Sequence, residues 1–168
     1  MNVPLARAGA PASMWWVLGL AVATSAIPIF IPDPQGEAGL WRFFPLVLTA
    51  GLLALGVMLP RRLAYALEPD ALVVSHMTGQ TRLPLNGMTV WRTAGHLGLK
   101  MGGTGLPGYY TGNYLFHADG LKNVLAASSA TRGGVIVQAN AKAYFLTPAD
   151  PEAFVAELAQ RGARVREN

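Results

Sequence analysis

Three glycines at the spacing of a phosphate-binding loop are the first residues in this sequence whose pattern suggests chemistry. Gly103, Gly105 and Gly108 reproduce the G-x-G-x-x-G spacing of dinucleotide-binding loops. In such loops the phosphates lie against the first turn of a helix, whose free N–H groups bind them. The residues from Tyr109 to Phe116 have the composition of a β-strand instead, and the kinase lysine, catalytic-loop and metal-binding motifs are not recognisable. We therefore expect no nucleotide site.

Histidines, hydroxyl groups and acids could also form a reactive or metal site, but their spacing does not support one. His76, His96 and His117 are about twenty residues apart, and none is near an acid at ligand spacing. Ser128 and Ser129 lie in a predicted turn without a neighbouring base. The sequence has no cysteine, which excludes thiolate ligands and a thiol nucleophile. We expect no metal, no cofactor and no enzymatic activity.

The glycine-rich segment between Gly95 and Gly112 is more informative as a backbone feature. Seven glycines and a proline in this segment let the chain turn, bulge and pass close to other groups. Two interpretations remain open: a tight or mobile loop, or a docking surface for lipid headgroups, for a partner chain or for the apolar helices described below. The candidate docking residues are Gly103, Gly105, Pro107, Gly108, Tyr109, Tyr110, Gly112 and Tyr114.

The elements that would position these residues fall into two parts of different composition. Only 13% of the chain is charged, about half the share of an average soluble domain. Residues 1–62 hold just six of the 22 Lys, Arg, Asp and Glu side chains. The net charge of +4 is too small and too scattered for a nucleic-acid surface. The composition therefore divides the chain near Arg62.

Two uncharged apolar runs in the first part predict transmembrane helices. The runs cover residues 14–31 and 43–59, and the second extends back to residue 40, so each nearly crosses a hydrocarbon core of about 30 Å. Residues 32–39 contain two prolines, two glycines and two acids, which predicts a tight turn between antiparallel helices. We expect a tail at 1–13 and then a helical hairpin within 14–62, with spans at about 14–31 and 40–59.

The residues at the ends of these runs predict an orientation. Arg7, Arg61 and Arg62 flank the side that both termini share. The turn holds two acids and has only Arg42 beside it, so the termini should face the cytoplasm. A cleaved secretory signal is one alternative, although its apolar region would be unusually long. Two buried helices of a soluble protein are another, although neither run has a polar face. The predicted membrane-interface anchors are Trp15, Trp16, Trp41, Arg61 and Arg62.

The second part of the chain has the pattern of a small β domain. Short runs of strand composition alternate with turn residues, and Asn86-Gly87 predicts a tight hairpin. Asp150 and Pro151 suit the N-cap and first position of a helix at about 150–161, before a tail at 163–168. We predict an antiparallel barrel or sandwich closed by one C-terminal helix. The predicted strands are 63–68, 71–77, 80–85, 88–93, 113–117, 121–127, 133–139 and 143–147.

Two stretches within this part resemble a known group of domains. The runs G-T-G-L-P-G-Y-Y-T-G-N-Y from Gly103 and A-Y-F-L-T-P-A-D-P-E-A-F from Ala143 are similar to the bacterial pleckstrin-homology-like (PH) families, whose members often have two N-terminal membrane spans. The resemblance implies a PH-like fold over about 63–162 in a membrane-anchored α+β protein of the bacterial inner membrane. Lipid-binding eukaryotic members use a basic loop between the first two strands. Here that loop contains Glu68 and Asp70, so we do not expect phosphoinositide binding.

Two functional hypotheses remain after these exclusions. In the first, the hairpin tethers a non-enzymatic binding module to the membrane, where it recruits or senses a protein or lipid partner. In the second, the chain is an oligomeric scaffold or an accessory subunit of a larger membrane complex. A transporter is not expected, because the spans have no ionisable residue inside the membrane to line a substrate pathway; Arg42, near the start of the second span, should extend to the interface.

Overall fold

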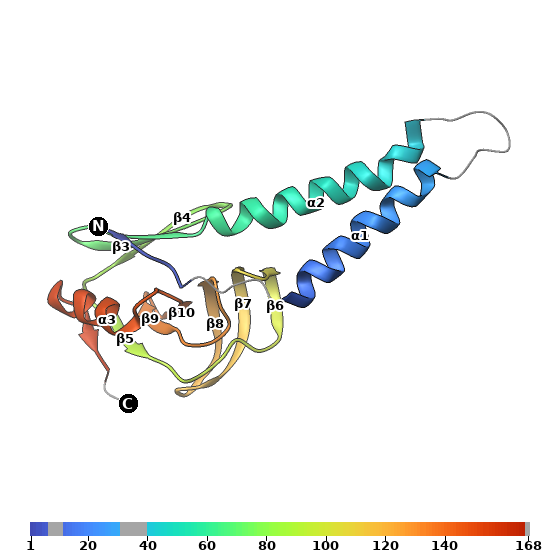
Figure 1. Ribbon diagram of the computed structural model, residues 1–168. Helices are drawn as coiled ribbons and strands as arrows, with labels where there is room; N and C mark the ends of the chain where they lie inside the picture. Colours follow the sequence, from blue (N-terminus) through green and yellow to red (C-terminus); the bar gives the residue numbers. More distant parts are fainter. Residues whose placement is uncertain (7–11, 31–39, 167–168) are drawn as a thin grey trace. The chain divides into compact units, whose positions relative to one another are not determined.

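The structure, a computed structural model, describes residues 1–6, 12–30 and 40–166 (Figure 1). The chain divides into two compact units. One unit is helical and comprises Gly9–Met58. The other is a β domain that combines Met1–Ala8 with Leu59–Asn168. In sequence, the helical unit is therefore inserted into the β domain, which is formed by residues on both sides of that insertion.

The helical unit contains the two expected helices. Helix α1 spans Ala12–Phe30, and α2 spans Phe44–Arg61 after the short 3-10 helix η1 at Leu40–Phe43. These bounds lie close to the predicted ones. The predicted turn at 32–39 and the side chains of Trp15 and Trp41 lie outside the described part of the chain. The Trp16 side chain is 82% exposed, and Arg61 and Arg62 are exposed.

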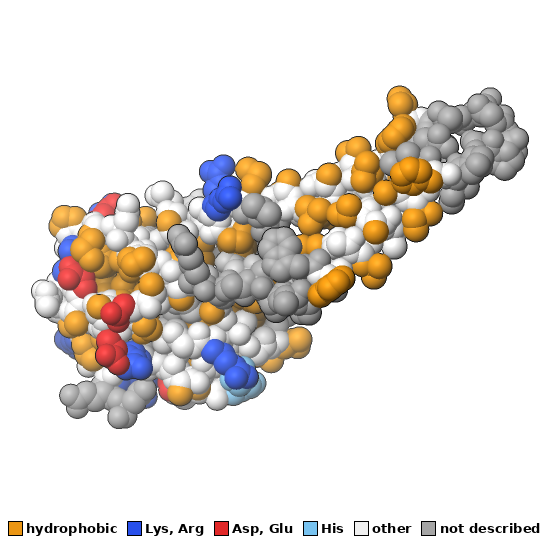
Figure 2. Space-filling model, viewed as in Figure 1, with side chains coloured by type: hydrophobic (Ala, Val, Ile, Leu, Met, Phe, Trp, Pro, Cys, Tyr) orange, Lys and Arg blue, Asp and Glu red, His pale blue; other side chains and the backbone are white. Residues whose placement is uncertain are grey.

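The apolar side chains of both helices are largely uncovered. Phe30, Phe44 and Leu52 are each more than half exposed, and Figure 2 shows such side chains (orange) along the helices. By length and composition α2 could cross a membrane. The described apolar stretch of α1, Leu18–Ile27, is shorter, so α2 alone meets this criterion within the part of the chain that the structure describes.

The first sheet of the β domain has four antiparallel strands in the order β1-β2-β3-β4. Its alternating apolar residues, such as Leu72 and Val74, are buried on one face, as a half-covered strand requires. The strands are β1 Asn2–Val3, β2 Ala64–Leu67, β3 Ala71–His76 and β4 Gly79–Pro84.

Strand β1 was not predicted, and it corrects the expected tail at 1–13. Val3 pairs with Tyr65 on β2, and the Leu67 N–H donates to the Met1 carbonyl oxygen at 2.8 Å. The next residues reach the other sheet, because the Ala6 N–H donates to the Thr147 carbonyl oxygen at 3.0 Å. A two-residue strand without alternation gives no sequence signal, since its pairing depends on a partner about sixty residues away.

The second sheet has seven strands in the order β11-β5-β9-β10-β8-β7-β6. It is mixed rather than antiparallel, because β10 runs parallel to β8 and β11 runs parallel to β5. The expected antiparallel sheet is therefore wrong at these two pairs, which join segments distant in sequence. The strands are β5 Thr89–Arg92, β6 Lys100–Leu106, β7 Tyr109–Ala118, β8 Leu121–Ser128, β9 Val135–Ala139, β10 Lys142–Leu146 and β11 Arg164–Val165.

Two further expectations about connections need correction. Asn86-Gly87 does form a turn, with Gly87 at φ +76°, but it carries the chain from one sheet to the other instead of closing a hairpin. The expected tail at 163–168 contains β11, whose Val165 pairs with Val90 on β5. Both errors have the same cause. Local turn chemistry specifies a change of direction, whereas the choice of partner strand depends on tertiary packing.

Helix α3, Pro151–Gln160, forms where the sequence predicts it. The Asp150 side chain accepts a hydrogen bond from the Ala153 N–H at 2.9 Å and so caps the helix. Phe154 and Leu158, four residues apart on one face, are buried in the core between the two sheets. The helix covers the side of the domain formed by β5 and β11, which it contacts.

Tyr65 links the two sheets through a buried hydroxyl group. The hydroxyl donates to the Ala127 carbonyl oxygen and accepts from the Thr147 N–H at 3.1 Å. Burial raises the pKa of Tyr65 above its ordinary value of 10.0. The folded domain therefore keeps this hydroxyl protonated at a pH at which the unfolded chain ionises it, and stability should fall as the pH rises above 10.0.

Replacing Tyr65 by phenylalanine should lower the free energy of unfolding by about 2 kcal/mol, because it leaves two buried backbone groups without a partner. Urea unfolding of the full chain in mild detergent would measure the change. Tyr144→Phe is the matched control, since Tyr144 is half-buried and its hydroxyl makes no hydrogen bond within the described residues. Equal losses in the two variants would contradict the proposed role of Tyr65.

Candidate functional site

The candidate docking residues form a β-hairpin and not a loop. Strands β6 and β7 pair directly, and the two-residue turn Pro107-Gly108 joins them. Gly108 has φ +81°, as a turn with proline at its first central position requires at the second. Strand β6 was not predicted from the sequence, because it is rich in glycine and glycine is depleted in strands.

Gly103 and Gly112 lie opposite each other in this hairpin, where the two backbones approach closely. Both have positive φ, +102° and +109°. A Cβ atom on Gly103 would collide with the Thr111 carbonyl oxygen, and one on Gly112 would lie 2.7 Å from the Gly103 Cα. Only glycine fits at either position without a shift of the strands.

The tyrosines of the hairpin make contacts within the domain. The Tyr109 hydroxyl accepts from the Met77 N–H at 2.9 Å, which holds the β3–β4 turn against β7. The Tyr114 hydroxyl donates to the Thr104 carbonyl oxygen at 2.8 Å. Burial, with a smaller contribution from Tyr110, raises the pKa of Tyr114. Tyr109 and Tyr114 are only 2% and 4% exposed, so their side chains are not available at the surface.

A groove of about 290 Å³ lies between the β3–β4 and β6–β7 hairpins. Its walls are mainly apolar, and four threonines and one histidine bring polar groups to it. Gly103 and Gly112 belong to the lining, so the missing side chains leave room for an occupant. The lining residues are Val74, His76, Thr78, Thr81, Gly103, Thr104, Thr111, Gly112, Leu125, Ala126, Ala127 and Tyr144.

His76 is held in place by two of these threonines. Its Nδ1 lies 2.9 Å from the Thr78 hydroxyl, and its Nε2 lies 3.2 Å from the Thr81 hydroxyl. A neutral imidazole donates one of these hydrogen bonds and accepts the other. The threonine hydroxyl that accepts the hydrogen bond from the ring can still donate its own proton to another acceptor. The groove can therefore bind an occupant by apolar contact and by hydroxyl donors.

The lining offers little for catalysis. It includes no acid, so His76 has no carboxylate to orient it as a general base. Among the described residues, no group of three potential ligands could hold a metal ion.

Two of the eight candidate docking glycines, prolines and tyrosines line this groove. Gly103 and Gly112 were candidates, and both line the groove. Gly105, Pro107 and Gly108 lie at the turn end of the hairpin and are not among the lining residues. The contribution of the β3–β4 hairpin was missed, because no local pattern places His76 opposite residues thirty positions later. The Thr78-Gly79 turn predicted where the β3–β4 hairpin lies in the sequence. It did not predict that the β6–β7 hairpin lies beside it.

A four-stranded sheet packed against a second sheet, with a C-terminal helix that covers one side and buries Phe154 and Leu158 in the core, is the arrangement of a PH-like domain. The model of the Bacterial PH domain family matches residues 63–162, more than half of the chain, and the chain belongs to this family. The match excludes β1 and β11, which lie outside it. No curated protein and no solved structure matches the chain. PH domains are generally binding modules without catalytic activity.

Proposed function

We propose that this protein is a non-enzymatic binding module that a hairpin of two transmembrane helices tethers to the cytoplasmic face of the bacterial inner membrane. There the PH-like domain recruits or senses a protein or lipid partner, and the groove between the β3–β4 and β6–β7 hairpins is its binding site. The observation that carries the proposal is the insertion of the helical unit between two paired strands, β1 and β2.

The pairing of β1 with β2 constrains how often the chain can cross a membrane. Residues 1–6 and the domain after Leu59 fold together, so they must lie on the same side of any bilayer. The segment between them then crosses an even number of times. If α2 crosses, α1 must cross back, which supports a two-span hairpin although α1 has the shorter apolar stretch. Cleavage of a secretory signal within α1 would remove β1 from the chain.

The surface chemistry of the helices agrees with lipid contact. At 1.5 Å per residue, the 18 residues of α2 extend about 27 Å, close to the hydrocarbon thickness of a bilayer. The hydroxyls of Thr24 and Ser25 donate to carbonyl oxygens one turn earlier in α1, at 2.9 Å for Leu20 and 2.6 Å for Ala21. These internal bonds satisfy polar groups that lipid could not.

The second candidate function is the oligomeric scaffold, and the position of β6 favours it. This strand lies at the edge of the seven-stranded sheet, and most of its residues are exposed. An exposed edge offers unpaired N–H and C=O groups to another chain. Concentration-dependent association of the full chain in detergent would favour the scaffold, whereas a monomer would favour the binding module.

Single-cysteine labelling in intact cells tests the tethering and its orientation, because the native chain has no cysteine background. We expect a membrane-impermeant thiol reagent to label Gly36→Cys and to spare Asn168→Cys until the cells are lysed. Labelling of Asn168→Cys alone would reverse the orientation. Labelling of both positions, or of neither before lysis, would contradict the two crossings.

A further inference from the structure

We propose that one end of the β domain, formed by the β3–β4 and β6–β7 turns, lies in the headgroup layer of the bilayer that the helices cross and binds anionic lipid headgroups there. We call this end, defined by Met77, Leu106, Arg61, Arg62 and Lys100, the cationic rim. The inference rests on the proposed function, because it requires α2 to end at the membrane surface.

The two turns meet at the last turn of α2. A Cβ atom on Gly108 would lie 3.6 Å from the Pro60 Cγ, so the β6–β7 turn is in contact with the helix end. The hydrogen bond from the Met77 N–H to the Tyr109 hydroxyl holds the β3–β4 turn beside it. Leu59, which precedes Pro60, is 8% exposed and belongs to the core of the domain. Leu59, Pro60 and Arg61, the residues of α2 that belong to the β-domain unit, thus lie at these turns.

This contact determines how far the turns can be from the membrane. The headgroup layer on each side of a bilayer is about 5–7 Å thick, since the total thickness is about 40–45 Å and the hydrocarbon core about 30 Å. If α2 crosses the bilayer and ends at Arg61, Pro60 lies at the boundary of the hydrocarbon core. Residues in van der Waals contact with Pro60 then lie within the headgroup layer.

The cationic rim has exposed apolar side chains suited to that layer. Met77, in the β3–β4 turn, is 59% exposed, and Leu106, the last residue of β6 before the Pro107-Gly108 turn, is 37% exposed. Polar residues are usual at and beside such turns. At the surface of a soluble domain these side chains would face water. In the headgroup layer they would contact acyl chains and contribute part of their transfer free energy.

The positions of the basic side chains also agree with contact between this end of the domain and the headgroups. Arg61 and Arg62 are exposed and form no ion pair within the described residues. The Lys100 side chain runs along β6 toward the turn, because its Cδ lies 3.5 Å from the place of a Gly105 Cβ. Arg61 and Arg62 thus lie next to Pro60, and the Lys100 side chain extends along β6 toward the turn that contacts Pro60. Each Lys or Arg near an anionic membrane surface is attracted to it.

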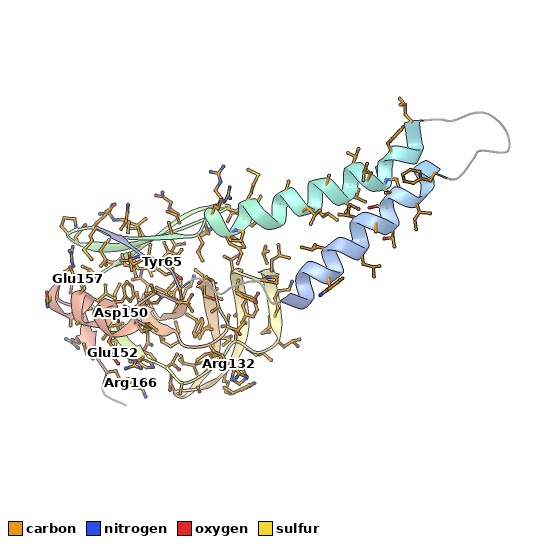
Figure 3. All side chains as sticks on the ribbon, viewed as in Figure 1. Tyr65, Arg132, Asp150, Glu152, Glu157 and Arg166 are labelled. Atoms are coloured by element: carbon orange, nitrogen blue, oxygen red, sulfur yellow. The ribbon has the colours of Figure 1, made fainter. Side chains whose placement is uncertain are left out.

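The acids that the structure describes lie elsewhere. Glu68 and Asp70 precede β3, at the end of that strand opposite Met77, and pair with Arg82 at 2.9 and 2.8 Å. Asp119 follows β7, at the end opposite Gly108. The remaining three belong to α3 or its cap, which contacts β5 and β11 at the sheet edge opposite β6. Figure 3 shows these three together: Asp150, Glu152 and Glu157.

Fluorescence quenching in lipid nanodiscs tests the position of the rim in the full chain. Met77→Cys and Leu106→Cys, labelled with an environment-sensitive fluorophore, should be quenched by lipids that carry a nitroxide near the headgroup. Lys142→Cys, at the far end of β10, is the negative control, because β10 starts at the end of the sheet away from the rim. Leu52→Cys, in the middle of α2, reports whether the helix crosses and needs a nitroxide deep in the acyl chain.

The four positions separate the two proposals. Quenching at Leu52, Met77 and Leu106 with none at Lys142 is the expected result. Quenching at Leu52 without quenching at Met77 or Leu106 would overturn the rim and leave the tethering intact. No quenching at Leu52 would overturn the tethering, and the rim with it.

A second comparison tests the anionic headgroups. Quenching at Leu106 should be at least twofold stronger in nanodiscs that contain phosphatidylglycerol than in purely zwitterionic ones. Lys100→Gln should reduce this lipid preference by about a third, since it removes one of three cations. Lys122→Gln, at the far end of β8, is the matched control and should leave the preference unchanged. Equal quenching in both lipids would overturn the electrostatic part of the inference.

Discussion

Replacing Gly103 by alanine should destabilise the β domain by about 3 kcal/mol. A non-glycine residue at φ +102° costs roughly 1–3 kcal/mol in backbone strain. The new methyl group would also collide with the Thr111 carbonyl oxygen, so the two strands must separate, at a further cost of about 1–3 kcal/mol. Gly112→Ala should have a similar effect, because its position faces Gly103 across the hairpin.

Gly102→Ala is the matched control for this experiment. Gly102 is the neighbouring residue on the same strand, its φ is not positive, and a Cβ atom there would meet nothing within 4 Å. Urea unfolding of the full chain in mild detergent, read by pulse proteolysis, gives the free energy of each variant. A loss with Gly102→Ala as large as that with Gly103→Ala would show that strand propensity, and not the close approach of the backbones, determines the effect.

The second large effect should come from the N-terminal strand. We expect Val3→Asp combined with Leu5→Asp to destabilise the domain by about 3 kcal/mol or more. Both side chains pack against the core between the sheets, and their replacement removes apolar burial and brings two carboxylates to that core. Asn2→Asp adds a charge at an exposed position of the same strand and should change little.

The same unfolding measurement separates these variants. A stable Val3→Asp/Leu5→Asp protein would mean that residues 1–6 are dispensable for the domain, and the argument for an even number of crossings would lose its basis. Destabilisation by Asn2→Asp as well would indicate a general effect of acidic charge on the N-terminal strand.

Local sequence signals were sufficient for much of the fold. The Asp150-Pro151 start of α3 and the Asp119-Gly120 turn both depend on contacts within a few residues, and both lie where the sequence predicts them. The apolar runs likewise located α1 and α2. What the sequence did not specify is long-range pairing, such as β10 beside β8 and β11 beside β5.

The candidate site illustrates the same division. The glycine content drew attention to the segment around Gly103. The glycines there do not form a flexible loop: Gly103 and Gly112 face each other where two strands approach closely. His76 and Thr81 join the groove only because the two sheets pack together. No spacing within the sequence encodes that contact, and the docking role of the hairpin stays a prediction.

The insertion of the helical unit between β1 and β2 also bears on biogenesis. During synthesis β1 emerges first and must wait for about sixty residues before its partner exists. If only one helix crossed, β1 would remain on the wrong side of the membrane and β2 would present an unprotected sheet edge, open to aggregation and proteolysis. If the helices span a membrane as we propose, completion of the domain would therefore require both of them to cross.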